Sequence, residues 1–206
     1  MNVEDPNAHH QALARQLADP GVPFSEIADR LDALETTTRT AVVRRLGGRE
    51  QRLLFERAEG RRPLSLVDLV PADRKDLEPV RHFGRNTLPA FRIFEKRFCR
   101  PEGESPDRPE ALVGYNHQTM SFVTGPGYFV AVEDPDRAEV LIDYTRPPGR
   151  VASGWPRVRS NERGLARFVY GFMVDRLRSV SGTVTVGSAA RNGRELGSYF
   201  VLDREA

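Results

Sequence analysis

Most of the polar side chains that could contact a ligand lie in the stretch 112–144. Its pattern predicts a strand, a tight turn, a strand, a second turn and a third strand. The residues concerned are Tyr115, Asn116, His117, Gln118, Tyr128, Asp143 and Tyr144. None of them belongs to a catalytic motif, so they indicate a place where a ligand could be held without indicating a reaction.

Three residues further along the chain, Tyr170, Asp175 and Arg178, extend this group. Aromatic hydroxyls beside one acid and one arginine suit a carboxylate or another polar head group, whose apolar tail would fill a barrel. The candidate ligand-binding residues are Tyr115, Asn116, His117, Tyr128, Tyr144, Tyr170, Asp175 and Arg178. Asp175 and Arg178 can instead form a local ion pair, because they are three residues apart on an expected turn. Ligand binding is therefore predicted only if these side chains face one cavity.

Catalysis is a separate hypothesis, in which His117 or Asp175 acts as an acid or base. The chain lacks the GxxxxGK[ST] phosphate loop and the GxGxxG, GxSxG and HExxH motifs. A histidine in a sheet, such as His82 or His117, is more often a structural hydrogen-bonding residue than a metal or haem ligand. Cys99 is expected to be a packed, unreactive thiol. We therefore expect no catalytic residues, no metal and no cofactor.

Residues 1–60 have the pattern of a helical N-terminal region. The pattern predicts helices over 9–18, from Ser25 onward, over 40–46 and over 49–59. The last three make up about 40 residues, which is near the lower size limit for independent stability. This region is therefore expected to pack on the rest of the chain.

The segment 25–46 also resembles a helix-turn-helix, which makes a DNA-binding regulator the alternative function. The side chains that could reach the major groove are Thr37, Arg39, Thr40, Arg44 and Arg45. The usual turn glycine is missing, and Asp29, Asp32 and Glu35 would repel phosphates. A solvated face on a packing helix is the favoured interpretation. Burial of Val42 and Val43 against the sheet would count against DNA binding.

Residues 81–206 have the composition of an antiparallel β domain, joined to the helices by a proline-rich connector over 61–80. Strands are predicted over 111–115, 120–124, 128–132, 139–144, 183–189 and 196–202. The last two are joined through Asn192-Gly193, which is a strong hairpin signal because both residues accept positive φ.

In two segments of this domain the apolar residues follow neither a clear helical nor a clear strand spacing. Residues 91–98 are predicted as a short helix leading into a strand over 97–100, with Glu95-Lys96-Arg97 as an ordinary charge run. The segment 165–180 is ambiguous between helix and strand, and is predicted as a strand up to Tyr170 followed by a helical turn over 174–178. Trp155, in a proline- and glycine-rich loop, is expected to cover an edge of the core.

These elements predict an α+β protein: short N-terminal helices followed by a strongly curved antiparallel β-sheet or small barrel. This is similar to the calycins in architecture alone, and a fold by itself does not establish function. A small barrel can enclose one ligand. The leading hypothesis is non-catalytic binding of a small apolar or amphipathic ligand in the β-sheet cavity.

The bulk composition agrees with a globular chain. Hydrophobic residues make up 39% of it, enough for a core, and the formal net charge is only +2, which gives nucleic-acid binding little support. There is no apolar run of about 18 residues and no N-terminal secretion signal. Cys99 is the only cysteine, so no internal disulfide can form. We expect a cytoplasmic protein with no membrane span, whose oligomeric state is left open.

Overall fold

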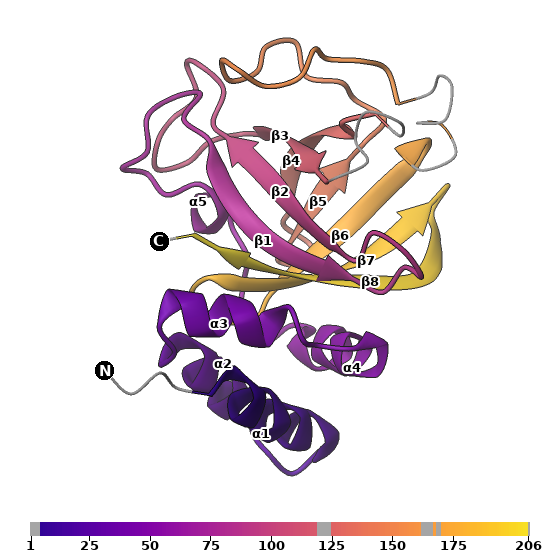
Figure 1. Ribbon diagram of the computed structural model, residues 1–206. Coiled ribbons are helices and arrows are strands. Elements are labelled where there is room, and N and C mark those ends of the chain that lie inside the picture. The colour runs from indigo at the N-terminus through magenta and orange to yellow at the C-terminus, as the bar shows by residue number, and fades with distance from the viewer. Residues whose placement is uncertain (1–4, 119–124, 162–166, 168–169, 206) are drawn as a thin grey trace.

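The computed structural model describes residues 5–118, 125–161, 167 and 170–205, and consists of a layer of helices packed against a β-barrel (Figure 1). The helices are α1 (Pro6–Ala18), α2 (Phe24–Asp32), α3 (Thr36–Val43), α4 (Gly48–Ala58) and α5 (Leu66–Leu69). The strands are β1 (Val80–Asn86), β2 (Ile93–Cys99), β3 (Leu112–His117), β4 (Tyr128–Asp134), β5 (Glu139–Asp143), β6 (Met173–Ser179), β7 (Val184–Arg191) and β8 (Arg194–Arg204).

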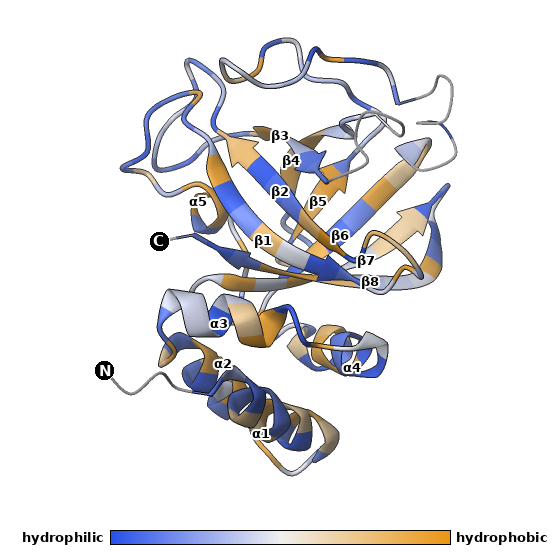
Figure 2. Ribbon diagram, viewed as in Figure 1, coloured by the Kyte–Doolittle hydropathy of each residue, from blue (hydrophilic) through white to orange (hydrophobic). Residues whose placement is uncertain are grey.

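The described strands form one closed antiparallel barrel in which each strand pairs with the next along the chain. β1 also pairs with β8, from His82 opposite Arg204 to Asn86 opposite Phe200, and this pairing closes the sheet. Polar and apolar bands follow one another along the strands (Figure 2), as expected where alternate side chains face the interior. The predicted α+β class with a small antiparallel barrel is confirmed.

The hairpin between β7 and β8 has the predicted turn. Asn192 and Gly193 both have positive φ, at 50° and 73°. This geometry matches the right-handed twist of the flanking strands. The hairpin prediction is therefore confirmed.

The short helix predicted within residues 91–98 was wrong, because strand β2 already begins at Ile93. The strand predicted over 97–100 is the last part of β2, which ends at Cys99. Phe94, Lys96 and Phe98 are all buried, and Ile93, Glu95 and Arg97 before them are less buried. The period of two was hidden in the sequence because its central inward position holds a lysine.

The helical turn predicted over 174–178 was also wrong, since these residues lie in strand β6. Asp175 lines the barrel interior, whereas Arg178 pairs with Glu139 and α4 on the outside. The two side chains point to opposite faces of a strand, so the alternative local ion pair does not form. The strand predicted over 120–124 lies outside the described residues.

The connector closes one end of the barrel. Leu64, Leu66, Leu69 and Val70 belong to the same apolar cluster as inward residues of the strands. The backbone N–H of Leu64 donates to Ala138 O at 3.0 Å, which fixes the connector at the β4–β5 turn. The interior is therefore filled at this end and can hold a ligand only towards the other.

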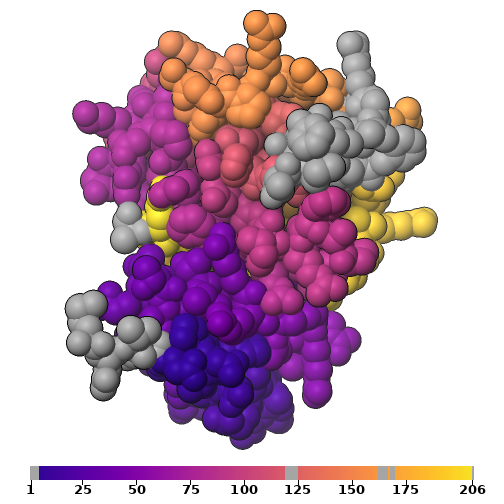
Figure 3. Space-filling model, in the orientation of Figure 1, coloured from indigo at the N-terminus to yellow at the C-terminus, as the bar shows by residue number. Residues whose placement is uncertain are grey.

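Helices α3 and α4 pack on the outer side of β7 and β8, while α1 packs on α2, α3 and α4. Together the helices form a layer at one end of the molecule (Figure 3, indigo to purple). Their apolar residues form one cluster with outward valines of the sheet. Its buried members are Leu13, Leu17, Ile27, Leu31, Leu34, Val42, Val43, Leu46, Leu54, Ala58, Val180, Val184, Val186 and Val201. The helical layer thus packs on the barrel, as expected for a region too small to be stable alone.

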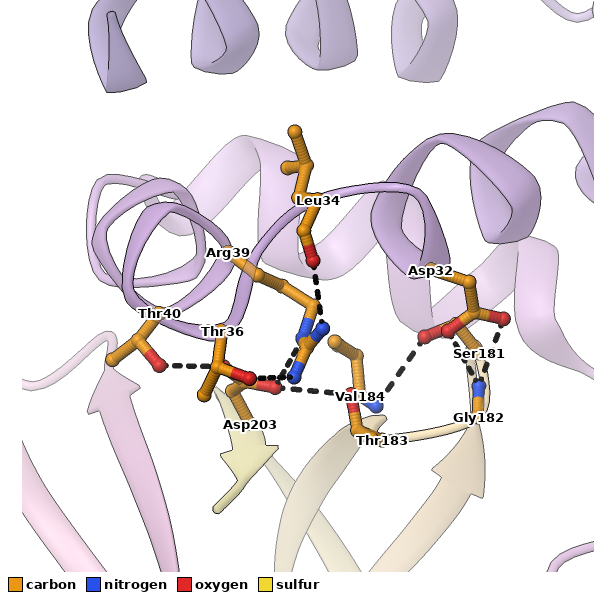
Figure 4. A network of polar contacts seen from close by, with 10 residues as sticks. All are labelled: Asp32, Leu34, Thr36, Arg39, Thr40, Ser181, Gly182, Thr183, Val184 and Asp203. Atoms are coloured by element: carbon orange, nitrogen blue, oxygen red, sulfur yellow. Dashed lines mark hydrogen bonds and ion pairs between the residues drawn. The ribbon is translucent and has the colours of Figure 1, made fainter. Parts of the chain in front are cut away.

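A buried ion pair joins α3 to the barrel (Figure 4). Arg39 Nε donates to Asp203 Oδ1 at 2.8 Å, and the hydroxyls of Thr40 and Thr183 donate to the same carboxylate at 2.5 and 3.1 Å. Arg39 and Thr40 were candidates for reading DNA, and both are engaged here. Val42 and Val43 are buried against the sheet. This arrangement counts against the helix-turn-helix hypothesis, because two of the five expected reading side chains, Arg39 and Thr40, are used to pack α3 on the barrel.

Candidate functional site

The open end of the barrel contains a cavity of about 430 Å³. Its wall is mainly apolar and aromatic, with a few polar groups among them. The lining residues are Asn86, Leu88, Ala90, Phe91, Phe94, Lys96, Asn116, Gln118, Tyr144, Tyr170, Met173, Asp175, Ala189, Arg191, Leu196, Ser198, Tyr199 and Phe200. This size and mixture are typical of a site for one small molecule.

Lys96 is the centre of a buried polar cluster in this cavity. Its Nζ donates to Asn116 Oδ1 at 3.0 Å, to the Tyr144 hydroxyl, and to Asp175 Oδ2 at 3.4 Å. Asn116 and Asp175 also bond to the Tyr144 hydroxyl, at 3.0 and 3.2 Å. Four side chains from β2, β3, β6 and the end of β5 therefore share one hydrogen-bond network.

Strand register accounts for this convergence. Lys96 lies directly opposite Asn116 in the β2–β3 pair. Asp175 faces the interior from β6, next to Tyr144, whose backbone N–H donates to Met173 O at 3.1 Å. The network therefore follows from alternation and barrel closure, without any special loop.

Aromatic rings surround the Lys96 amine. Its Nζ lies 4.8 Å from the ring centroid of Phe200, 5.0 Å from that of Tyr144 and 5.1 Å from that of Phe129. Gly187 pairs with Phe200, and a Cβ at Gly187 would collide with that ring. The glycine thus leaves space for one wall of this aromatic cage.

Burial controls the protonation of the cluster. Burial lowers the pKa of Lys96, against the opposing attraction of Asp175. Burial likewise raises the pKa of Asp175, against the opposing effect of Lys96, and raises the pKa of Tyr144 well above its usual value. Loss of hydration favours the neutral form of each group. Burial therefore brings the pKa values of the Lys96 amine and the Asp175 carboxyl closer together.

One oxygen of the cluster lacks a hydrogen-bond partner among the residues that the structure describes. Asp175 Oδ1 is buried and accepts no hydrogen bond within the described part of the chain. Leaving a buried acceptor unpaired costs about 1–3 kcal/mol. A ligand with a hydroxyl, amine or amide N–H could satisfy this atom.

The structure divides the predicted site residues into two groups. Asn116, Tyr144, Tyr170 and Asp175 line the cavity. The Tyr170 ring stacks on that of Tyr144, with centroids 5.4 Å apart, and its hydroxyl accepts from Gln118 Nε2 at 3.1 Å. Half of the predicted set is thus gathered in one place.

The other four predicted residues do not reach the cavity. Tyr115 and Tyr128 lie on the outer face of the barrel, where both rings contact Trp155. His117 is exposed on that same face. The Arg178 guanidinium bonds to Glu139 at 2.7 Å and lies 3.9 Å from the Phe55 ring centroid, so it joins the barrel to α4. These positions follow from strand alternation, because Tyr115 and His117 flank the inward Asn116.

Sequence reasoning missed Lys96, which it interpreted as part of a charge run. A compositional signal could have found it. Lys75 and Lys96 are the only lysines among 31 lysines and arginines. Almost all basic residues of this chain are arginines, yet position 96 is a lysine. It lies two residues from both Phe94 and Phe98, which is the spacing of side chains on one face of a strand.

A larger hollow of about 970 Å³ lies among α1, α2, α4 and the loops that join them. Arg57 lines it, and its guanidinium already donates to backbone oxygens of Gln16, Leu17 and Asp19. Among the described residues, none that lines this hollow has a buried polar side-chain atom without a partner, in contrast to Asp175 in the barrel cavity.

Comparison of the chain with models of known protein families, with curated proteins and with solved structures finds no match in any of the three. Among the described residues, none of the helices combines the length and apolar character that crossing a bilayer requires. These same residues include no group of three or more histidine, cysteine and acidic side chains placed to hold a metal ion.

Proposed function

We propose that the barrel binds one small, largely apolar molecule whose polar group faces the cluster of Lys96, Asn116, Tyr144 and Asp175. The observation that carries this proposal is the cavity itself: an apolar wall with a buried polar cluster, in which Asp175 Oδ1 has no hydrogen-bond partner among the described residues. Apolar walls supply affinity, and a few convergent polar groups supply orientation.

The opening of the cavity supports entry of an apolar molecule. Leu88, Phe91 and Leu196 line it and are among the exposed large hydrophobic side chains. They lie near the β1–β2 and β7–β8 hairpins, at the end of the barrel opposite α5. An apolar ligand would cover part of this surface on binding, which is a favourable transfer from water.

Binding without turnover remains the favoured function. His117, one of two candidates for an acid or base, is exposed on the outer face and does not line the cavity. The DNA-binding alternative is weakened because Arg39 is buried in its pair with Asp203.

The first test is native mass spectrometry of the gently purified protein, followed by denaturation and identification of any small molecule released. In parallel, the dye anilinonaphthalenesulfonate is titrated with the protein, and the rise in its fluorescence gives the affinity. Ala189→Phe fills the cavity and should weaken dye binding by at least about tenfold. Arg194→Phe adds the same side chain at an exposed position of the same hairpin and should leave the affinity unchanged. Equal affinities for both variants would refute binding in this cavity.

A further inference from the structure

We propose that Lys96 holds its ligand covalently, as an imine formed with an aldehyde or ketone whose apolar part fills the barrel cavity. This inference rests on the proposed binding function and specifies the ligand's reactive group. It assigns the amine a chemical role in addition to its hydrogen bonds. It also explains why a lysine, rather than an arginine, occupies this position.

An imine needs an amine that can lose its proton inside an apolar site. Lys96 is 2% exposed in its side chain, lines the cavity and lies among the rings of Phe129, Tyr144 and Phe200. A buried lysine becomes neutral readily, whereas an arginine stays protonated. Desolvated lysines in hydrophobic pockets are the type that attacks carbonyl carbon.

The neighbours of Lys96 supply the proton transfers that imine formation requires. Asp175 Oδ2 lies 3.4 Å from Nζ, and Asp175 Oδ1 has no partner in the described chain. The Tyr144 hydroxyl contacts both Nζ and Oδ2. The carboxylate can therefore take a proton from the amine and later give it to the departing hydroxyl, with the phenol beside both Nζ and Oδ2.

The reaction balances with these groups alone. The Lys96 ammonium gives one proton to the Asp175 carboxylate, and the Nζ lone pair then forms a bond to the carbonyl carbon. The C=O π pair moves to oxygen, which takes a proton from the nitrogen to give a carbinolamine. The nitrogen lone pair then forms C=N, the C–O bond breaks, and the departing hydroxyl takes the Asp175 proton. One water is released, and the protonated imine lies beside the Asp175 carboxylate, so no oxidant or reductant is consumed.

The chain contains its own control amine. Lys75, the only other lysine, is exposed on the connector. Its amine faces solvent and lacks the apolar surroundings of Lys96. Any difference in labelling between the two lysines thus measures the effect of the cavity.

The experiment incubates the whole protein with naphthaldehyde and sodium cyanoborohydride, which reduces an imine to a stable secondary amine. Naphthylmethanol, similar in shape but without the carbonyl, is the control probe. Peptide mapping should find one naphthylmethyl group on Lys96, with at least about tenfold more label there than on Lys75, since the apolar cavity holds the probe beside a desolvated amine. Lys96→Arg, which keeps a cation, should remove this label.

The outcomes separate this inference from the proposed function. Label confined to Lys75 and the amino terminus, with both probes retained non-covalently in native mass spectra, would overturn the imine and leave ligand binding intact. Failure of both probes to bind, together with an unlabelled Lys96, would refute both proposals. Because the mapping is done on the unaltered chain, the result does not depend on the folding of a variant.

Discussion

Lys96 on β2 and Asp175 on β6 meet inside the barrel, with Nζ and Oδ2 3.4 Å apart. Three strands separate β2 from β6 in either direction around the closed sheet. Backbone hydrogen bonds join only neighbouring strands, so this contact joins opposite walls. The ion pair therefore links two walls of the cavity and also provides the charged groups that face a ligand.

Lys96→Met should destabilise the protein, because it leaves the Asp175 carboxyl group buried without its cationic partner. Breaking one side of a buried ion pair typically costs about 3–5 kcal/mol. Urea unfolding at neutral pH measures this cost. Asp175→Leu should destabilise the protein similarly, since it leaves the Lys96 amine buried without its carboxylate partner.

The double variant Lys96→Met with Asp175→Leu is the decisive control for this pair. Two apolar side chains of similar size leave no buried charge, so its stability should lie within about 1 kcal/mol of the parent or above it. If the two single losses simply add in the double variant, Lys96 and Asp175 do not interact energetically.

His82 should make the protein acid-sensitive. Its Nε2 lies 3.0 Å from Leu69 O, Nδ1 has no partner within the described chain, and burial lowers its pKa from 6.5 to about 3. Between these two values the unfolded chain binds the extra proton, so stability is lost as the pH falls from 6.5 towards 3. The slope from this one group is at most about 1.4 kcal/mol per pH unit.

Unfolding free energies measured from about pH 7 to about pH 4 test this prediction, since that range lies inside the titration window. His82→Gln should flatten the slope, because an amide can still donate to the Leu69 carbonyl but does not titrate. His117→Gln, at an exposed position, should leave the slope as it is. Equal slopes for the parent and His82→Gln would refute the assignment to His82.

The sequence allowed prediction of the barrel but only half of its site. Period-two patterns and the Asn192-Gly193 turn depend on local preferences, which sequence reveals directly. Which face of a strand is inside depends on barrel closure, a non-local property. Tyr115 and Asn116 are adjacent, and nothing local shows that the amide faces inward while the larger ring packs outside.

Lys96 and Asp175 illustrate the other limit of sequence reasoning. Buried charges break the apolar pattern that marks a strand, and both segments were misassigned as helical for that reason. Burying them requires a partner, which here lies 79 residues away in the chain. The residues around each of these two positions therefore do not indicate that pairing.

Arg39→Met should weaken the attachment of the helical layer. It leaves the fully buried Asp203 carboxylate with the hydroxyls of Thr40 and Thr183 in place of a cation. We expect a loss of about 3 kcal/mol or more in urea unfolding. Arg45→Met, which removes an exposed guanidinium bonded to Ala41 O near the end of α3, should change stability by less than about 0.5 kcal/mol.

Cys99 should be inert in the folded protein. Its thiol is fully buried on the outer side of β2, and burial raises its pKa to about 12. Because the thiolate is the reactive form, reaction with an aromatic disulfide reagent should be about a thousandfold slower than in the unfolded chain. The absorbance of the released thiolate gives both rates.

Trp155 shields this thiol from solvent, since it packs against the cluster of Cys99, Val113 and Ala152. Trp155→Ala should therefore speed the reaction of the folded protein several-fold, by letting water and reagent approach the thiol. Val158→Ala, at an exposed position of the same loop, should leave the rate unchanged. A thiol that stays equally slow in Trp155→Ala would show that the strands themselves, rather than the loop, keep the reagent out.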